Sequence, residues 1–408
     1  MVSLEKITHL ASQSKFDTLG ENSFFEPQVD IGKAKRLGYG IKRDRFSSKY
    51  TFSGKDPIDQ KDEISKACVY HAWGQNGRRV SLFKTLFTNS CHHQCNYCTN
   101  ASNCTNRSKK ISYTPGELAR TTMKLYREKY IEGLFLSSGA GRDQEVIMEK
   151  MIESANLLRN KYNFRGYIHL KVLPGTSLDH IKQAAEPADR LSINIETTSP
   201  IYMDEICPTK DYKNDIISRQ RYIKNILKYR NLPGGQTTQL IVGGTDESDR
   251  EIFDSIRYEY KKLDMRRVYY SSFHPIGGTA YEKREAQPLW REHRLYQMDW
   301  LYRIYNLDEK EIGHAFGDEG YLANTDPKTT IARETFDSPI DPNHASYREL
   351  VRIPGIGPKS ASRIVIMRKR EKIIKREQLR SLGAVVNRAR PFIKLNGWCD
   401  STLDRWMK

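Results

Sequence analysis

Ser90-Cys-His-His-Gln-Cys-Asn-Tyr-Cys-Thr99 is the stretch from which the fold and the chemistry of this chain can be predicted. Its cysteines, Cys91, Cys95 and Cys98, can hold three corners of a four-iron cluster. The fourth iron then stays open to a substrate or cofactor, whereas a site with four cysteines is closed. The spacing therefore indicates a metal centre that carries out chemistry.

Zinc is the alternative metal for this stretch. Cys104 lies six residues after Cys98 and could complete a four-thiolate site, and His92 and His93 are close in sequence. Structural zinc sites usually contain two separated Cys-x-x-Cys pairs, and this chain has no second pair. The pattern favours the cluster and leaves zinc open.

The cysteine stretch resembles the radical SAM superfamily, in which the open iron binds the amino and carboxylate groups of S-adenosylmethionine. Tyr97, just before the last cysteine, also matches the superfamily's usual pattern. The resemblance implies a [4Fe-4S] cluster on Cys91, Cys95 and Cys98, with S-adenosylmethionine as second cofactor. It further implies a 5'-deoxyadenosyl radical that abstracts a hydrogen atom from the substrate.

Length and composition are those of a cytoplasmic enzyme. The chain has 408 residues and seven cysteines, an odd number that suggests reduced thiols rather than a disulfide framework. The N-terminus has no apolar run of signal-peptide length, and no stretch of about 18 apolar residues occurs. We therefore expect a cytoplasmic protein that does not use a membrane.

Strand-like and helix-like segments alternate after the first 79 residues. The candidate strands are 80–88, 133–138, 166–173, 190–196, 237–242 and 267–273, and the candidate helices are 115–129, 143–161, 176–184, 211–229 and 248–263. Strands separated by helices form parallel sheets through right-handed crossovers. We expect an α/β fold, a partial (β/α)6 barrel, which is also the core of the radical SAM superfamily. The cysteines then follow the carboxyl end of the first strand, where such folds place active sites.

The fourth strand supplies two candidate cofactor contacts. In Leu191-Ser-Ile-Asn-Ile-Glu196 the apolar residues share one face and the polar residues the other. With helices outside, Asn194 and Glu196 should face the barrel interior. The resemblance implies that both bind the ribose hydroxyls of S-adenosylmethionine, and a solvated outer edge is the alternative.

Other strand ends match cofactor-binding positions of the superfamily less closely. Ser137-Ser-Gly139 occupies the place of a Gly-Gly-Glu motif but lacks the acidic residue, so only the backbone roles of Ser138 and Gly139 carry over. Gly243 ends the fifth strand, where the family packs backbone against adenine. Ordinary strand-to-loop turns explain these residues equally well.

Three further residues could act inside the barrel. His169 and Lys171 alternate with apolar neighbours and could contact the cofactor carboxylate or an acidic substrate, although a lysine at a strand end can also extend into solvent. Cys207, in a Cys-Pro turn after the fourth strand, is a candidate hydrogen-atom donor to a product radical.

Positive charge is concentrated near the C-terminus. The formal net charge is +17, and between Arg352 and Lys394 there are thirteen Lys or Arg residues against Glu371 and Glu377. Such a segment can neutralise phosphates and release counterions. A solvated helix face is the alternative explanation for charge alone.

Residues 349–368 lie in this basic segment and read as helix, tight turn and helix. Gly355 and Gly357 bracket Ile356, and amides at the start of the second helix can point at a phosphate. The segment resembles the helix-hairpin-helix module that grips DNA backbones, and a generic helical corner is the alternative. The resemblance implies a nucleic-acid contact by Gly355, Ile356, Gly357, Lys359, Ser360 and Arg363. Residues 377–390, with Gly383, suggest a degenerate second half of a four-helix unit.

We therefore expect an N-terminal extension at 1–79, a radical SAM barrel at 80–283, a helical extension at 284–340 and an all-α helix-hairpin-helix domain at 341–408. Within the extension, the basic stretch 31–48 carries aromatic residues suited to nucleic-acid contact, and a solvated loop explains this stretch equally well. Together these parts resemble the family of DNA modification or repair radical SAM proteins. That resemblance implies DNA as partner and an electron donor such as ferredoxin or flavodoxin. RNA modification, or a non-catalytic metal-cluster protein that binds DNA, are the alternatives.

Overall fold

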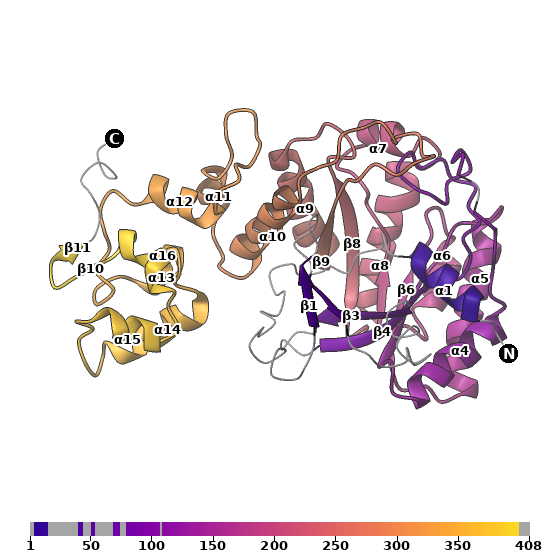
Figure 1. Cartoon of the computed structure of the whole chain (residues 1–408), viewed down its shortest axis with the longest axis horizontal. Helices are drawn as coiled ribbons and strands as arrows, with labels where there is room; N and C mark the ends of the chain where they lie inside the picture. The colour runs from indigo at the N-terminus through magenta and orange to yellow at the C-terminus, as the bar shows by residue number, and fades with distance from the viewer. Residues whose placement is uncertain are drawn as a thin grey trace. The chain divides into compact units, whose positions relative to one another are not determined.

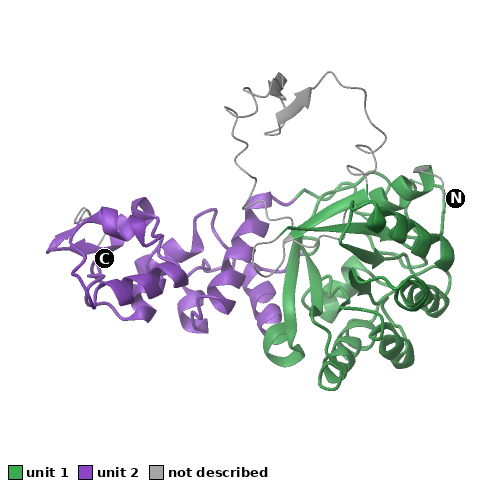
Figure 2. Cartoon of the chain, turned by 90° about the horizontal axis from the view of Figure 1, so that it is seen from below, with its two compact units in different colours: residues 1–245, 258–286 green, residues 246–257, 287–408 purple. Residues whose placement is uncertain are grey.

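The computed structural model describes residues 4–14, 40–43, 50–53, 68–73, 79–106 and 108–399 (Figure 1). It divides into two compact units, residues 1–245 with 258–286 and residues 246–257 with 287–408 (Figure 2). In the N-terminal extension, α1 (Leu4–Gln13) is described, and β1 (Gly40–Arg43) pairs antiparallel with β2 (Tyr50–Ser53). The rest of the basic stretch 31–48 lies outside the described residues.

Unit 1 is built on one curled sheet with the order β3-β4-β5-β6-β7-β8-β9. Its strands are β3 (Val69–Trp73), β4 (Arg79–Leu86), β5 (Gly133–Ser137), β6 (Tyr167–Lys171), β7 (Arg190–Ser192), β8 (Gly235–Val242) and β9 (Met265–Ser272). Strands β4 to β9 are parallel, which confirms the six predicted units of a partial barrel. The prediction missed β3, which pairs antiparallel with β4 at the sheet's edge.

Helices cover the convex side of the sheet (Figure 1). They are α4 (Pro115–Arg127), α5 (Gln144–Asn156), α6 (Leu178–Ala184), α7 (Pro200–Ile206), α8 (Ser218–Leu227) and α9 (Asp249–Leu263). Leu134, Ile168 and Leu191, which alternate with the concave-face residues, are fully buried. Thr114 and Glu117 form a capping box at the start of α4. Helix α7, capped by Ser199, was not predicted.

The concave face is identified by contacts between strands that are distant in the sheet. Leu82 of β4, Phe135 of β5 and Tyr269 of β9 belong to one hydrophobic cluster. Because β4 and β9 are the second and the last strand, their side chains meet only across the inside of the curl. Residues in register with these three therefore face the barrel interior.

Unit 2 is mainly helical. Its helices are α10 (Leu289–Arg303), α11 (Glu309–Gly313), α12 (Pro327–Thr335), α13 (Tyr347–Arg352), α14 (Pro358–Met367), α15 (Arg376–Ser381) and α16 (Val386–Ala389), followed by the short pair β10 (Lys394–Leu395) and β11 (Trp398–Cys399). One apolar core joins α13 to α16 with Ala332 and Phe336 of the preceding segment. Among the described residues, no helix is both long and apolar enough to cross a membrane.

Candidate active site

The cysteine loop follows β4 and is held from three sides by backbone bonds. The Asn96 amide donates to Ile206 O at the end of α7 (2.9 Å), and the Tyr281 amide donates to Asn96 O (3.0 Å). On the third side, the Gly141 amide donates to Ser90 O (3.0 Å). A Cβ at Gly139 would lie 2.2 Å from Ser90 O, so only glycine permits this close approach of the loop after β5.

Backbone amides already face two of the three predicted cluster ligands. The Ala140 amide donates to Cys91 Sγ and the Asn100 amide to Cys98 Sγ, each at 3.4 Å. Hydrogen bonds to the sulfur ligands adjust the reduction potential of an iron-sulfur cluster. Amides that donate to these two sulfurs therefore suit thiolate ligands of a cluster. Burial raises the pKa of the unligated thiols of Cys91 and Cys98, the latter to about 12. Metal binding must therefore displace protons from them.

The residues proposed for a zinc site do not converge. Cys104 points to Asn106 O, and His93 Nδ1 lies 3.2 Å from Thr209 Oγ1. Burial lowers the pKa of His93 to about 3, so its ring is neutral. In the part of the chain that the structure describes, no three His, Cys, Asp or Glu side chains are placed to hold a single metal ion. Ligands of a four-iron cluster bind different irons and need not meet at one point.

Two residues that follow α7 complete the surroundings of Cys95. Cys207 Sγ lies 2.6 Å from Cys95 Sγ, and Lys210 Nζ lies 3.1 Å from Glu196 Oε1. A hydrogen bond from Cys207, assisted by the Lys210 ammonium, lowers the pKa of Cys95 to about 7. Burial alone would lower the pKa of Lys210, but Cys207, Cys95 and Glu196 together raise it well above its ordinary value. The predicted Cys207 thus lies at the cysteine loop, beside a lysine that was not predicted.

Glu196 combines burial, charge and an unusual backbone. Its side chain is 6% exposed, and its φ is +63°, which is rare for a residue with a Cβ. Backbone bonds hold this conformation, because the Glu196 amide donates to Gln239 O and Glu196 O accepts from the Ile241 amide. Asn194 Nδ2 donates to Glu196 Oε2 at 3.3 Å. The two predicted ribose contacts are therefore adjacent.

The remaining predicted cofactor contacts lie at the same carboxyl edge of the sheet. Tyr97 is close enough to Glu196 and the cysteines that burial, followed by their charges, raises its pKa well above the ordinary value. Ser138 Oγ donates to Gly139 O (2.7 Å) and accepts from the Thr88 amide (3.3 Å). Lys171 ends β6 in register with Ser192, and Gly243 follows β8 with a φ of +72°. The sequence suggests these residues as cofactor contacts, but it does not indicate their contacts with one another.

In unit 2, the predicted hairpin is present at residues 353–357. Gly355 has a φ of +85°, and a Cβ there would lie 2.4 Å from Val385 O. The Val385 amide donates to Gly355 O (2.8 Å), which docks the second half of the module, including Gly383, onto the first. Lys328 Nζ donates to Ile356 O at 2.6 Å, and the Ile356 side chain is fully buried. Ile356 is therefore a core residue, and since its amide also donates to Ile353 O (3.1 Å), neither its side chain nor its backbone suits the predicted nucleic-acid contact.

Helix α14 begins at the hairpin without a side-chain cap. Gly357 is its N-cap residue, so no side chain occupies the first-turn amides that could face a phosphate. Lys359 and Arg363 are exposed one turn apart on this helix. Ser360, in contrast, is buried beside Gly383, so its side chain is unsuited to the predicted contact, although its amide remains at the helix start.

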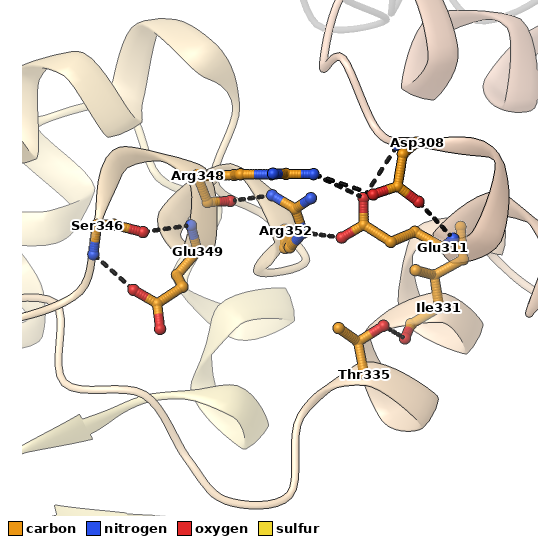
Figure 3. A network of polar contacts seen from close by, with 8 residues as sticks. All are labelled: Asp308, Glu311, Ile331, Thr335, Ser346, Arg348, Glu349 and Arg352. Carbon is orange, nitrogen blue, oxygen red and sulfur yellow. Dashed lines mark hydrogen bonds and ion pairs between the residues drawn. The ribbon is translucent and has the colours of Figure 1, made fainter.

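An ion-pair network joins α11 and α13 within unit 2 (Figure 3). Arg352 pairs with Glu311, and Arg348 pairs with Asp308 at 3.0 Å. Ser346 and Glu349 form a capping box at the start of α13. Arg352, the first of the thirteen basic residues in the segment, is thus used for internal structure rather than for surface charge.

Two parts of the chain match known protein families. Residues 85–258 match the model of the radical SAM superfamily, and residues 336–385 match that of the helix-hairpin-helix motif. No curated protein matches the chain.

Similar solved structures have low sequence identity. The FeFe-hydrogenase maturase HydG from Carboxydothermus hydrogenoformans is 12% identical with a TM-score of 0.42, over 52% of this chain and 49% of that one. Methylornithine synthase (PylB) is 17% identical with a TM-score of 0.45, over 55% and 63%. SuiB of Streptococcus suis is 12% identical with a TM-score of 0.42, over 74% and 63%. This chain therefore spans about half to two thirds of the length of these proteins.

Proposed function

Because the chain carries a radical SAM domain at residues 85–258 and a helix-hairpin-helix motif at 336–385, we propose that it is a radical SAM enzyme that modifies or repairs DNA. The cofactors of the superfamily are a [4Fe-4S] cluster and S-adenosylmethionine. The observation that carries the proposal is the presence, in one chain, of this cysteine site and a glycine hairpin that begins an uncapped basic helix.

Cys91, Cys95 and Cys98 are the residues that would hold the cluster. Their sulfurs meet two backbone amides and a buried lysine, a donor set suited to a thiolate-bound cluster. The bound cofactors supply an electron transfer that cleaves S-adenosylmethionine and generates a 5'-deoxyadenosyl radical. The protein's part is to orient the cofactor and to exclude water from it.

The carboxyl edge of the sheet supplies the groups for that orientation. Glu196 and Asn194 offer adjacent oxygen and amide groups to the ribose hydroxyls, and Lys210 fixes the Glu196 carboxylate. Tyr97, Ser138, Gly139, Lys171 and Gly243 are the further cofactor contacts that we propose. The contact between Cys207 and Cys95 supports a role for Cys207 at the cysteine loop more than as a hydrogen-atom donor.

The C-terminal module would hold DNA by its backbone. The amides after Gly357, with Lys359 and Arg363, form the proposed phosphate contact, and phosphate contacts of this kind do not read sequence. A stacked base cannot enter a barrel, so the substrate would be an extruded or single-stranded nucleotide. An electron donor such as ferredoxin or flavodoxin, and a cytoplasmic location, complete the proposal.

Anaerobic reconstitution followed by incubation with S-adenosylmethionine and dithionite tests the enzyme assignment. We expect a brown protein that releases 5'-deoxyadenosine, and the Cys95→Ala variant should release none because the cluster lacks a ligand. The Cys104→Ala variant is the matched control and should retain cleavage. A colourless, zinc-containing protein without cleavage would disprove the assignment.

The substrate is tested separately with DNA and RNA supplied to the reconstituted enzyme. Mass spectrometry of the nucleosides should detect an altered nucleoside from DNA. An altered nucleoside only from RNA would replace DNA by RNA in the proposal. Genomic DNA from cells with and without the protein, compared in the same way, would identify the product.

A further inference from the structure

Two free thiols face each other beside the cysteine loop. Cys207 Sγ lies 2.6 Å from Cys95 Sγ, although 112 residues separate them in the chain. Both residues are buried, and neither is part of a disulfide. A sulfur–sulfur bond is about 2.05 Å long, so the two atoms need to approach by only about 0.5 Å to form one. The two side chains therefore already meet the first requirement for a disulfide.

The backbone around both cysteines holds this contact in place. The Gln94 amide donates to Thr209 Oγ1 (3.0 Å), and the Asn96 amide donates to Ile206 O (2.9 Å). The residues directly before and after the first cysteine are thus bonded to the segment that contains the second. The contact between the two sulfurs therefore follows from the way the loop is docked, and not from the position of one side chain alone.

The other cysteines of the loop have different partners. Cys91 Sγ and Cys98 Sγ each accept a hydrogen bond from a backbone amide. Cys104 Sγ points to Asn106 O at 3.8 Å. Among the described residues, Cys95 is thus the predicted cluster ligand whose sulfur meets a second thiol that is not itself a predicted ligand.

Oxidation of this pair by hydrogen peroxide is a balanced reaction. One sulfur, as its thiolate, attacks a peroxide oxygen, the O–O bond breaks, and a sulfenic acid and water are formed. The second sulfur then attacks the sulfenic sulfur, the S–O bond breaks, and a second water is released. The two thiols lose two protons and two electrons, and the peroxide gains both. A dithiol reverses the reaction by thiol–disulfide exchange.

We propose that Cys95 and Cys207 form a reversible disulfide on oxidation, which withdraws Cys95 from the cluster ligands and so controls cluster loading. The inference rests on the proposed function, because it takes Cys91, Cys95 and Cys98 as those ligands. A disulfide has no thiolate to offer to iron, so the oxidised chain keeps two ligands of the three. A thiol without a partner is oxidised further to sulfinic and sulfonic acids, which dithiols do not reduce. The disulfide therefore keeps Cys95 recoverable.

Disulfide mapping of the full chain tests the proposal. The chain is prepared without a cluster, reduced, freed of reductant and treated with hydrogen peroxide. The remaining thiols are then alkylated, and the peptides are identified by mass spectrometry. We expect a linked peptide that contains Cys95 and Cys207 and that disappears after treatment with dithiothreitol. A link from Cys95 to Cys91 or Cys98 instead, or no link at all, would overturn the inference.

Cluster loading provides a second readout. A preformed [4Fe-4S] cluster is offered on a carrier protein without a thiol reductant, and its uptake is measured by visible absorbance and iron content. The reduced chain should take up the cluster, and the peroxide-treated chain should lose this uptake because one ligand is missing. Dithiothreitol should then restore it. Equal uptake by the reduced and the oxidised chain would contradict the proposed control of loading.

Two serine variants make the result specific. Cys207→Ser lacks the second thiol, so peroxide should convert Cys95 to sulfinic or sulfonic acid, and dithiothreitol should no longer restore uptake. Cys104→Ser is the matched control, because it also removes a buried cysteine, but one outside the sulfur pair. This control should behave as the original chain does. Restored uptake in Cys207→Ser would overturn the inference.

Folding of the variants is checked by circular dichroism of the reduced proteins. Mapping of the original chain needs no variant, so it tests the inference even if Cys207→Ser does not fold.

Cofactor cleavage separates this inference from the proposed function. A chain that cleaves S-adenosylmethionine but never links Cys95 to Cys207 would overturn the inference and leave the enzyme assignment intact. A chain that forms the link but neither binds a cluster nor cleaves the cofactor would support the disulfide and disprove the proposed chemistry.

Discussion

The cysteine loop and the hairpin at 353–357 both bring backbone close to a proposed ligand, but they are held in different ways. The sulfurs of Cys95 and Cys207 meet although 112 residues separate them. The hairpin joins two consecutive helices, and its cations Lys359 and Arg363 are exposed on one of them. A catalytic site thus needs buried groups that converge from distant parts of the chain. A contact to backbone phosphates needs only a local turn and surface charge.

The largest expected effect concerns the buried pair in unit 1. Glu196→Gln leaves the Lys210 ammonium buried without its carboxylate, so unit 1 should lose about 3–5 kcal/mol of unfolding free energy. Urea denaturation measures this loss. The double variant Glu196→Gln with Lys210→Met removes both charges and should recover part of the stability. If the single and double variants are equally unstable, the ion pair is not what stabilises this site.

The stability and DNA affinity of the hairpin in unit 2 should depend on its backbone conformation rather than on a buried ion pair. Gly355→Ala places a Cβ against Val385 O at a positive φ, so unit 2 should be destabilised by about 1–3 kcal/mol and DNA affinity should fall. Gly357→Ala is the control, because its φ is −93° and its Cβ would meet only Tyr305 Oη at 3.3 Å. Denaturation and DNA titration of both variants measure the effect, and equal losses would contradict this explanation.

Protonation of Lys328 should make the stability of unit 2 depend on pH. Burial lowers the pKa of Lys328 to about 7 from an ordinary value of 10.5. Between these values the unfolded chain binds a proton that the folded chain does not, so stability rises with pH, by at most about 1.4 kcal/mol per pH unit. Lys328→Met should remove this rise between pH 7 and 10 in urea denaturation. The exposed Lys394→Met variant should retain it.

The smallest expected effects are single surface charges on α14. Lys359→Ala and Arg363→Ala should each reduce the slope of log affinity against log salt by about 1, because each removes one phosphate contact. Titrations of duplex DNA at several salt concentrations measure the slope. Arg352→Ala should instead act through stability, since Arg352 pairs with Glu311 inside the unit. A slope unchanged in all variants would place the DNA contact elsewhere.

Much of the fold could be predicted because its signals are local. Strand-like and helix-like patterns of apolar residues located the six parallel strands and most helices, and glycine spacing located the hairpin. Strand β3 and helix α7 were missed because they are short, five and seven residues, so their local patterns are weak. Lys210 was missed because nothing adjacent to it in sequence indicates its pairing with Glu196.

By itself, the sequence determined the order of strands and helices and the glycine turn, and it predicted the three cysteine ligands, since these depend on residue type and spacing. Only the tertiary structure decided which side chains meet. It placed Cys207 instead of Cys104 beside the cysteine loop, made Ile356 a core residue, and left Arg190 and His169 side by side inside the barrel. Burial and charge pairing arise from contacts between distant segments, so local sequence patterns do not contain them.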